Sequence, residues 1–153
     1  MNSKDIIARL PYQHPFLFVD KISTMSSEGI TGNYTFQEDS YFYQGHFKNH
    51  PITPGVLLTE CMAQIGLVCL GLFLLGEEFE TDEHTSSSAP QIALTSSEIQ
   101  FFLPVYPGEK VTVISEKELF RFQKLKCKVK MLNDKNELVC RGTISGMLNV
   151  PKT

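Results

Sequence analysis

The chain has 153 residues, 42% hydrophobic and 20% charged, which is enough for one domain, residues 1–153, with a buried core. Its formal net charge of −3 provides no overall positive field and argues against nucleic acid as the main partner. The N-terminal stretch MNSKDIIARLPYQ lacks the pattern of a signal peptide, so we expect a cytoplasmic protein.

The first third of the chain predicts one short helix and two strands. Residues 2–9 suit a helix with Ser3 as its N-terminal cap, because a hydroxyl residue precedes two isoleucines. The stretches FLFVDKI (16–22) and GITGNYTFQ (29–37) indicate strands joined by a polar turn. The aromatic stretch at 39–47 is interrupted by glycine and indicates no regular element.

The longest apolar segment runs from Gly55 to Gly76 and raises the question of a membrane span. Glu60 and Gln64 lie in its first half, and a buried acid is costly in hydrocarbon. An acidic, serine-rich stretch follows at 77–91, which we expect to form a longer, mobile loop. The segment therefore predicts a helix buried inside the protein, with no membrane span.

The second half of the chain predicts four strands, over residues 92–105, 110–120, 123–132 and 137–150. A polar turn at 133–136 joins the last two. In the third strand every second residue is a lysine, and the residues between are apolar: Lys124, Lys126, Lys128 and Lys130 against Leu125, Cys127, Val129 and Met131. This alternation predicts an antiparallel sheet with one face in water, so the apolar face has to pack on the single long helix.

Four cysteines are present, and none belongs to a CxxC motif that would indicate a zinc or redox site. Cys61 and Cys69 are about 12 Å apart on one helix at roughly 1.5 Å per residue, too far to bridge. Cys127 and Cys140 fall in strands expected to be adjacent, where a bridge stays open. We favour four buried free thiols.

The stretch GHFKNHPITPGVLLTE at 45–60 places two histidines before the predicted helix. Pro51 pushes His50 toward extended conformations, and the Pro-Gly pair ending at Gly55 stops the helix from extending backwards. His46 is therefore expected on a loop at the helix N-terminus. There, free amide N–H groups stabilise an oxygen that becomes negative.

Glu60 lies about one and a half turns inside this helix, with Gln64 one turn further along the same face. Burial among apolar neighbours is expected to raise the pKa of the Glu60 carboxyl and favour its neutral form. An imidazole, a carboxylic acid and an oxyanion site suit removal of a proton beside a carbonyl, with acid assistance to a departing oxygen.

Taken singly, these residues also fit other roles, since such histidines often make structural hydrogen bonds and such acids often pair with lysine. The His46-x3-His50 spacing with Glu60 resembles a two-histidine, one-carboxylate metal site. Because Pro51 denies these histidines a helix, we expect no metal. His50 and Gln64 are instead expected to orient the loop and the Glu60 carboxyl.

Three blocks are spread over residues 10–111 of the chain: LPYQHPFLFVDKI (10–22), FYQGHFKNHPITPGVLLTECMAQ (42–64) and IQFFLPVYPGEKV (99–111). They resemble the FabZ-type 3-hydroxyacyl-[acyl-carrier-protein] dehydratases, whose pattern is roughly LPHRYPFLLVD, FFxGHFPxxPIxPGVLxxEAxAQ and RFRxPVxPGD. The resemblance implies an α+β hotdog fold, an antiparallel sheet wrapped around one long central helix. It also implies a homodimer, with hexamers (trimers of dimers) possible in the family.

By this resemblance, His46 removes the α-proton of a (3R)-3-hydroxyacyl thioester, and Glu60 protonates the departing β-hydroxyl. The N–H of Gly55, next to Val56, holds the thioester oxygen, and the product is a trans-2-enoyl thioester. In the family the histidine and the acid come from different subunits, so the dimer is required. The substrate is carried by the phosphopantetheine of an acyl carrier protein, and no metal or organic cofactor is needed.

The chain also departs from the pattern. The Pro-Gly after GHF is replaced by Lys48-Asn49, and the arginines of RFR are replaced in QFF (100–102), where Phe101 and Phe102 are expected to line the acyl tunnel. A specialised dehydratase of a polyketide or polyene pathway therefore remains open. So do a thioester hydrolase and a non-catalytic subunit. The lysines 124–130 are either a carrier-docking row or a solvated face partly neutralised by Glu116 and Glu118.

Overall fold

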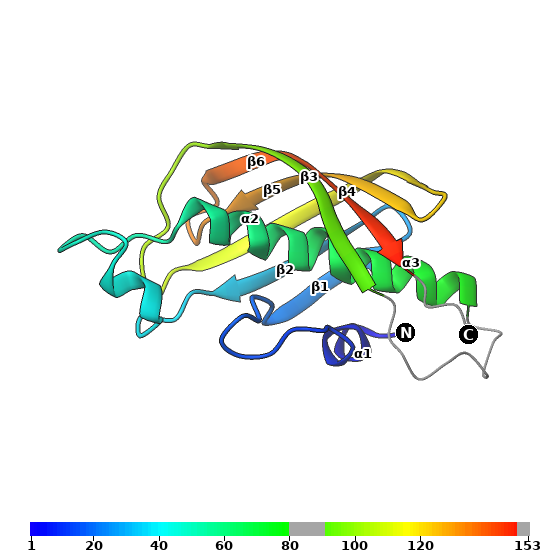
Figure 1. Cartoon of the computed structure of the whole chain (residues 1–153), viewed down its shortest axis with the longest axis horizontal. Helices are drawn as coiled ribbons and strands as arrows, with labels where there is room; N and C mark the ends of the chain where they lie inside the picture. The colour runs from blue at the N-terminus through cyan, green and yellow to red at the C-terminus, as the bar shows by residue number, and fades with distance from the viewer. Residues whose placement is uncertain (80–90, 150–153) are drawn as a thin grey trace.

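The computed structural model describes residues 1–79 and 91–149, in which a six-stranded antiparallel sheet curves around one long helix (Figure 1). The elements are α1 (Ser3–Ala8), β1 (Lys21–Ser26), β2 (Gly29–Thr35), η1 (Tyr41–Gln44), α2 (Gly55–Ala63), η2 (Gln64–Cys69), α3 (Leu70–Phe79), β3 (Gln91–Phe101), β4 (Lys110–Arg121), β5 (Lys124–Leu132) and β6 (Leu138–Asn149). The strand order is β1-β2-β4-β5-β6-β3. This is the α+β architecture that the sequence predicts.

The elements α2, η2 and α3 form one continuous helix, in which η2 is a stretch of π-helix. By length and composition the 22 residues Gly55–Gly76 could cross a bilayer, with a mean hydropathy of 1.9. Of the most apolar window, however, 72% is buried inside the protein, because the curved sheet covers it. The helix is the core of the fold.

The helix and the sheet approach closely at Gly66 in η2. A Cβ added at Gly66 would lie 3.0 Å from the Cβ of Ser115 on β4 and 3.1 Å from Cγ1 of Val129 on β5. The buried Ser115 hydroxyl donates a hydrogen bond of 2.9 Å to the Gly66 carbonyl. The π-helical stretch therefore gains a donor from the sheet, where the regular helical bonding pattern is interrupted.

The strand β5 has the predicted apolar and basic faces. Its four inward residues are almost completely buried: Leu125 (0% exposed), Cys127 (0%), Val129 (3%) and Met131 (0%). The lysines between them point outward, and Glu118 on β4 forms ion pairs with Lys126 (3.7 Å) and Lys128 (3.3 Å). The predicted partial neutralisation thus comes from Glu118. Glu116, which lies opposite Lys128 in the strand register, forms no ion pair with described residues.

Two predictions for the N-terminal region are wrong in detail. The helix cap is Asn2 rather than Ser3, because Asn2 and Asp5 form a reciprocal capping box. The predicted strand at 16–22 begins only at Lys21, because the backbone at 16–18 bonds to the side chain of Gln64 instead of a neighbouring strand. A contact with a residue so distant in sequence leaves no mark on local periodicity.

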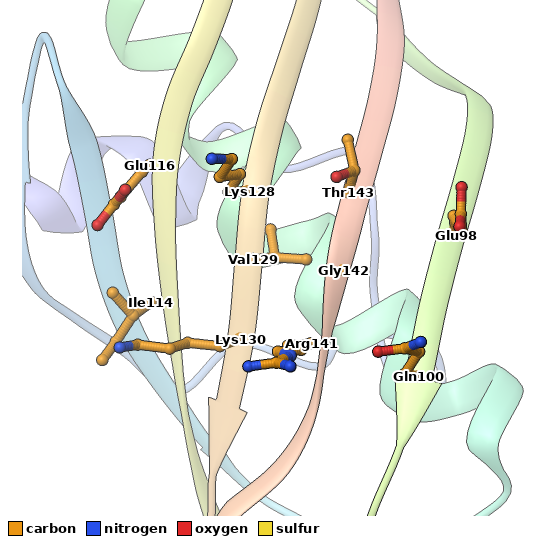
Figure 2. Close-up of a pocket in the computed structure, with 10 residues that line it drawn as sticks. All are labelled: Glu98, Gln100, Ile114, Glu116, Lys128, Val129, Lys130, Arg141, Gly142 and Thr143. Carbon is orange, nitrogen blue, oxygen red and sulfur yellow. The ribbon is translucent and has the colours of Figure 1, made fainter.

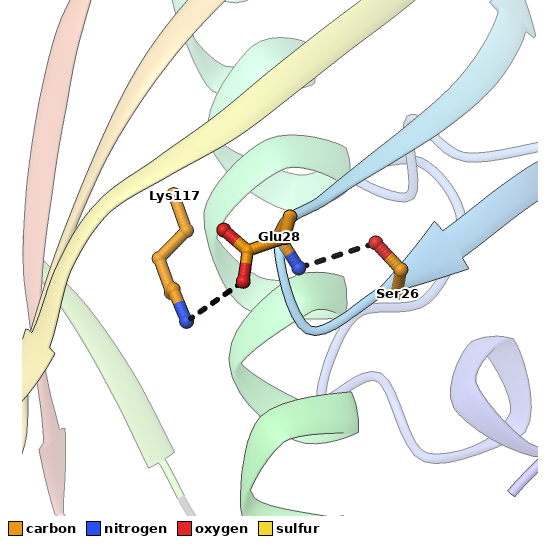
Figure 3. Close-up of polar contacts among 3 residues, drawn as sticks. All are labelled: Ser26, Glu28 and Lys117. Carbon is orange, nitrogen blue, oxygen red and sulfur yellow. Dashed lines mark hydrogen bonds and ion pairs between the residues drawn. The ribbon is translucent and has the colours of Figure 1, made fainter.

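The strand limits differ elsewhere by a few residues. The expected strand at 92–105 ends at Phe101, and the acidic stretch at 77–91 lies largely outside the described residues. β1 and β2 are joined by a tight turn that contacts β4, where Lys117 forms an ion pair of 4.0 Å with Glu28 (Figure 3). The Glu28 N–H also donates to Ser26 Oγ over 3.1 Å, which holds the turn at this sheet edge.

All four cysteines are buried free thiols. Cys127 and Cys140 do lie on adjacent strands, but their partners in the register are Ile144 and Met131. They therefore do not face one another, and the bridge left open by the sequence is not formed. Burial raises the pKa of the Cys140 thiol to about 12, which keeps it protonated and unreactive.

Candidate active site

The loop that carries His46 is fixed to its surroundings by backbone and side-chain hydrogen bonds. The N–H of Ile52 donates to the His46 carbonyl over 3.0 Å, and the N–H of Thr53 donates to Val105 over 2.8 Å. The buried hydroxyls of Tyr43 and Thr53 are 2.6 Å apart. The loop therefore lies at the start of α2, as the sequence predicts (Figure 1).

The imidazole of His46 is held in one tautomer. Its Nδ1 lies 2.9 Å from the carbonyl oxygen of Ile52, and a carbonyl only accepts hydrogen bonds. Nδ1 therefore carries the proton in the neutral ring, and Nε2 keeps a free lone pair. The Phe47 ring stacks on the imidazole with centroids 3.9 Å apart and limits its rotation. This is the arrangement that a general base requires.

The first amides of α2 are available to an external oxygen. The N–H groups of Leu57 and Leu58 both donate to Pro54, but among the described residues no acceptor pairs with those of Gly55 or Val56. Pro54 caps the helix without a side-chain hydrogen bond. The positive end of the helix dipole and two free donors thus lie together, which suits a developing oxyanion.

Two adjacent phenylalanines on the end of β3 lie on opposite sides of the chain. A Cβ added at Gly55 would be 3.3 Å from the Phe101 ring, so Phe101 covers the helix start. Phe102 instead lies under the Arg141 guanidinium, 5.5 Å from the ring centroid. Each ring is 49% exposed, and Val56 is 77% exposed, so the apolar rim of this region is open in the single chain.

Glu60 is connected to the N-terminal loop through Gln64. The amide nitrogen of Gln64 donates to the Glu60 carboxylate over 3.2 Å and to the Phe16 carbonyl over 3.1 Å. Its amide oxygen accepts from the N–H of Phe18 over 2.8 Å. Gln64 is completely buried, so these bonds fix both the loop and one carboxylate oxygen.

The pKa of the half-buried Glu60 carboxyl lies above its ordinary value. Burial raises the pKa of Glu60, and the hydrogen bond from Gln64 partly opposes this because it stabilises the carboxylate. Tyr12, from the same N-terminal loop, is close enough for the Glu60 charge to act on it. Burial and then Glu60 raise the pKa of Tyr12 to about 12, so its phenol remains a neutral donor.

The structure brings the predicted residues together in two groups. Glu60 contacts Gln64, and Gly55 contacts Phe101, whereas no hydrogen bond or ion pair between described residues joins His46 to Glu60. In the part of the chain that the structure describes, no cluster of three histidine, cysteine, aspartate or glutamate side chains could hold a metal ion.

Sequence reasoning gave no role to two residues near this site. Tyr12 lies near Glu60 although it is 48 positions away in the sequence, and Arg141 contacts Phe102 from the neighbouring strand. Tyr12 belongs to the block LPYQHPF, whose resemblance to the family pattern is the one signal in the sequence that could have marked it. Arg141 follows an apolar stretch with no motif around it, so nothing local marks it.

The same architecture occurs in solved structures. A dehydratase heterocomplex, ApeI:P, from Xenorhabdus doucetiae has a TM-score of 0.73 at 14% identity, covering 100% of this chain and 93% of the matched chain. A hypothetical thioesterase with coenzyme A from Streptococcus pneumoniae has a TM-score of 0.59 at 13% identity, covering 86% and 87%. These likenesses define the class of fold, the α+β hotdog.

Sequence similarity then identifies the family. A family model described as a FabA-like domain matches residues 10–144. The 3-hydroxyacyl-[acyl-carrier-protein] dehydratase FabZ of Caldicellulosiruptor bescii is 33% identical over 147 residues, covering 94% of this chain and 95% of that protein. The chain belongs to the FabA-like family and, within it, to the FabZ-type dehydratases.

Proposed function

We propose that this chain dehydrates (3R)-3-hydroxyacyl thioesters on an acyl carrier protein to trans-2-enoyl thioesters, with His46 as base and Glu60 as acid. One observation carries the assignment of roles: the Nδ1–H of His46 is committed to the Ile52 carbonyl, which leaves Nε2 as a proton acceptor at the start of α2. The raised pKa of Glu60 provides the complementary proton donor.

The reaction requires no group beyond these side chains and the helix amides. The thioester carbonyl accepts from the Gly55 N–H, which stabilises negative charge on its oxygen and acidifies the α-carbon. His46 Nε2 takes the α-proton, and the electrons of that C–H bond form the double bond between the α- and β-carbons. The bond from the β-carbon to oxygen breaks, and the hydroxyl leaves as water with the proton of Glu60. A proton returned from His46 to Glu60 through solvent restores the enzyme.

A homodimer completes this site in our proposal. His46 and Glu60 share no contact between described residues, and the edge strand β3 is exposed along almost its whole length. Leu94 and Phe101 on this strand are 44% and 49% exposed, which is unusual for a free sheet edge. Pairing of two β3 edges would cover them and bring His46 of one subunit toward Glu60 of the other. A hexamer built from three such dimers is a further assembly of the same kind.

The same proposal includes the acyl carrier protein as partner, a cytoplasmic location and a pathway that supplies the substrate. Val56 and Phe101 lie at the helix start and are assigned to substrate binding, whereas Gln64 holds the Glu60 carboxyl and Phe102 lies beside Arg141. Four free thiols are typical of a reducing compartment, which supports a cytoplasmic location. The substrate comes from fatty-acid synthesis or, as the substitutions at 48–49 and 100–102 suggest, from a related polyketide or polyene pathway.

One assay tests the reaction against the hydrolase alternative. The purified protein is given a 3-hydroxyacyl thioester, and enoyl absorbance is followed together with free-thiol release. We expect enoyl formation without thiol release. Thiol release alone would assign the chain to hydrolysis, and the absence of both signals would assign it to a binding role.

The catalytic roles are tested with His46→Ala and Glu60→Gln. Each substitution removes one proton-transfer step, so we expect a loss of about 10²- to 10⁴-fold in kcat. Circular dichroism and size-exclusion chromatography would verify that each variant keeps its fold and assembly. His50→Ala serves as the matched control, because His50 is exposed and has no assigned proton transfer.

A further inference from the structure

The outward cations on β5 and β6 are not equivalent. Lys126 and Lys128 both form ion pairs with Glu118, whereas Lys130 lies directly opposite Arg141 in the antiparallel register. Neither Lys130 nor Arg141 forms an ion pair with any residue that the structure describes. Like charges directly opposite one another destabilise a sheet, so this pair carries a structural cost that an anionic partner would offset.

The pair is part of an open groove on the outer face of the sheet. The groove has a volume of about 440 Å³ and is lined by residues of β3, β4, β5 and β6. Figure 2 shows Lys130 extending toward Ile114, with the Arg141 side chain next to it on the same face. Gln100, opposite Arg141 on β3, adds a neutral polar group at this end of the groove. The two acids that line the groove, Glu98 and Glu116, lie at its other end, where Lys128 also lies (Figure 2).

Phe101, the last residue of β3, and Phe102 after it lie between the groove and the start of α2. The Arg141 guanidinium lies over the Phe102 ring, and Phe101 covers Gly55 on the other side of the same strand. The cation pair is therefore next to the rim through which a substrate would reach Gly55. This chain has Gln100 and Phe102 where the family pattern has arginines. Arg141 lies beside Phe102 and supplies a cation at this rim.

We propose that Lys130 and Arg141 form the docking point for the acidic surface of the acyl carrier protein, an inference that rests on the proposed function. Charge complementarity is the supporting argument, because two exposed and unneutralised cations beside the site attract a protein with clustered carboxylates. The planar Arg141 guanidinium, positioned by Phe102, can bind a carboxylate through two hydrogen bonds. The rest of the lysine row contributes less, because Lys126 and Lys128 already pair with Glu118.

The test compares two substrates that carry the same 3-hydroxyacyl group. One is bound to acyl carrier protein, and the other is an N-acetylcysteamine thioester, which has neither carrier nor phosphate. In Lys130→Glu and Arg141→Glu we expect the ratio of kcat/KM on the carrier substrate to kcat/KM on the small thioester to fall about tenfold or more. The decrease should come from KM and should shrink at high salt, because the attraction is screened.

Two controls separate docking from general charge and from folding. Lys124→Glu introduces the same charge change on the same face of β5, about 20 Å from Lys130 at roughly 3.3 Å per residue, and should leave the ratio unchanged. Arg141→Lys keeps the charge but loses the planar group that binds a carboxylate through two hydrogen bonds, so its ratio should lie between those of the unsubstituted protein and Arg141→Glu. An equal decrease for Lys124→Glu would overturn the proposal.

A third substrate, the coenzyme A thioester, distinguishes a protein surface from a phosphate. Coenzyme A supplies the phosphopantetheine phosphate without the carrier. If Lys130→Glu lowered kcat/KM on the coenzyme A thioester as much as on the carrier substrate, the pair would bind phosphate alone and the docking proposal would be wrong. If the unsubstituted protein did not turn over the small thioester at all, the proposed function itself would be contradicted.

Discussion

Gln64 donates a hydrogen bond to Glu60 across 3.2 Å from the same amide nitrogen that donates to the Phe16 carbonyl, and its amide oxygen accepts from the Phe18 N–H. One buried side chain therefore connects the proposed catalytic acid to a loop that precedes it by more than 40 residues. Because the amide is committed at both ends, Glu60 cannot rotate freely, and its second oxygen remains available for a substrate hydroxyl. Gln64 thus acts as a positioning residue.

Replacement of Gln64 by leucine should affect both stability and the pH profile. The N–H of Phe18 and the carbonyl of Phe16 would lose their partner, at about 1–3 kcal/mol for each unpaired group. The hydrogen bond lowers the pKa of Glu60, so its loss raises that pKa further. Glu60 would keep its proton to higher pH, and the alkaline limb of kcat should move to higher pH. Denaturant unfolding and a pH–rate profile measure the two effects, with the exposed Gln37→Leu as control.

Replacement of Glu60 by glutamine should stabilise the protein at alkaline pH while it removes activity. The pKa of Glu60 is raised in the folded chain, so the folded state binds more protons than the unfolded state between the two pKa values. The free energy of unfolding therefore falls as pH rises through the folded pKa. Glutamine carries no charge and avoids this loss. We expect Glu60→Gln to have a higher Tm than wild type at pH 9. At about pH 4, below the folded and the unfolded pKa of Glu60, the two Tm values should be similar. The same Tm difference at pH 4 and at pH 9 would contradict this prediction.

Mixing of inactive subunits tests whether the site is shared. As homodimers, His46→Ala and Glu60→Gln each lack one catalytic group in both sites and have little activity. Random exchange gives heterodimers in which one site carries both substitutions and the other carries none. We expect recovery of about a quarter of the wild-type rate after unfolding and refolding of an equal mixture. If each site lay within one subunit, the mixture would stay inactive.

The overall architecture could be predicted from the sequence because it is encoded in local periodicity. The alternation around Cys127 on β5 and the long apolar run from Gly55 each determine which face is buried, and those faces have to meet. The start of α2 was also predictable, since proline and glycine act on the backbone conformation within one or two residues.

The remaining details depend on contacts between distant segments. The loop at 16–18 reads as a strand because its residues are apolar, but Gln64 supplies the hydrogen bonds that a neighbouring strand would have supplied. The tautomer of His46 likewise depends on the carbonyl of Ile52, which any residue type could provide. Backbone groups have no residue-specific signature, so such contacts emerge only from the folded chain.

Removal of the Ser115 hydroxyl should destabilise the fold without affecting the chemistry. Ser115 is 2% exposed and donates to Gly66 over 2.9 Å. Ser115→Ala leaves that carbonyl short of a donor, and we expect a loss of about 1–3 kcal/mol in the free energy of unfolding. The exposed Ser97→Ala on β3 is the matched control and should change stability by less than about 0.5 kcal/mol. Unfolding curves in urea measure both variants.

The close contact at Gly66 limits where a fatty chain can go. A single added carbon at Gly66 would press on Ser115 and Val129, and one at Gly71 would lie 2.5 Å from Ile92, so this part of the interior has no room for methylene groups. In the proposed dimer, the acyl-chain length that the enzyme accepts then depends on the interface between the two subunits. Substitutions at that interface would change the product length without altering the fold of either subunit or the reaction chemistry.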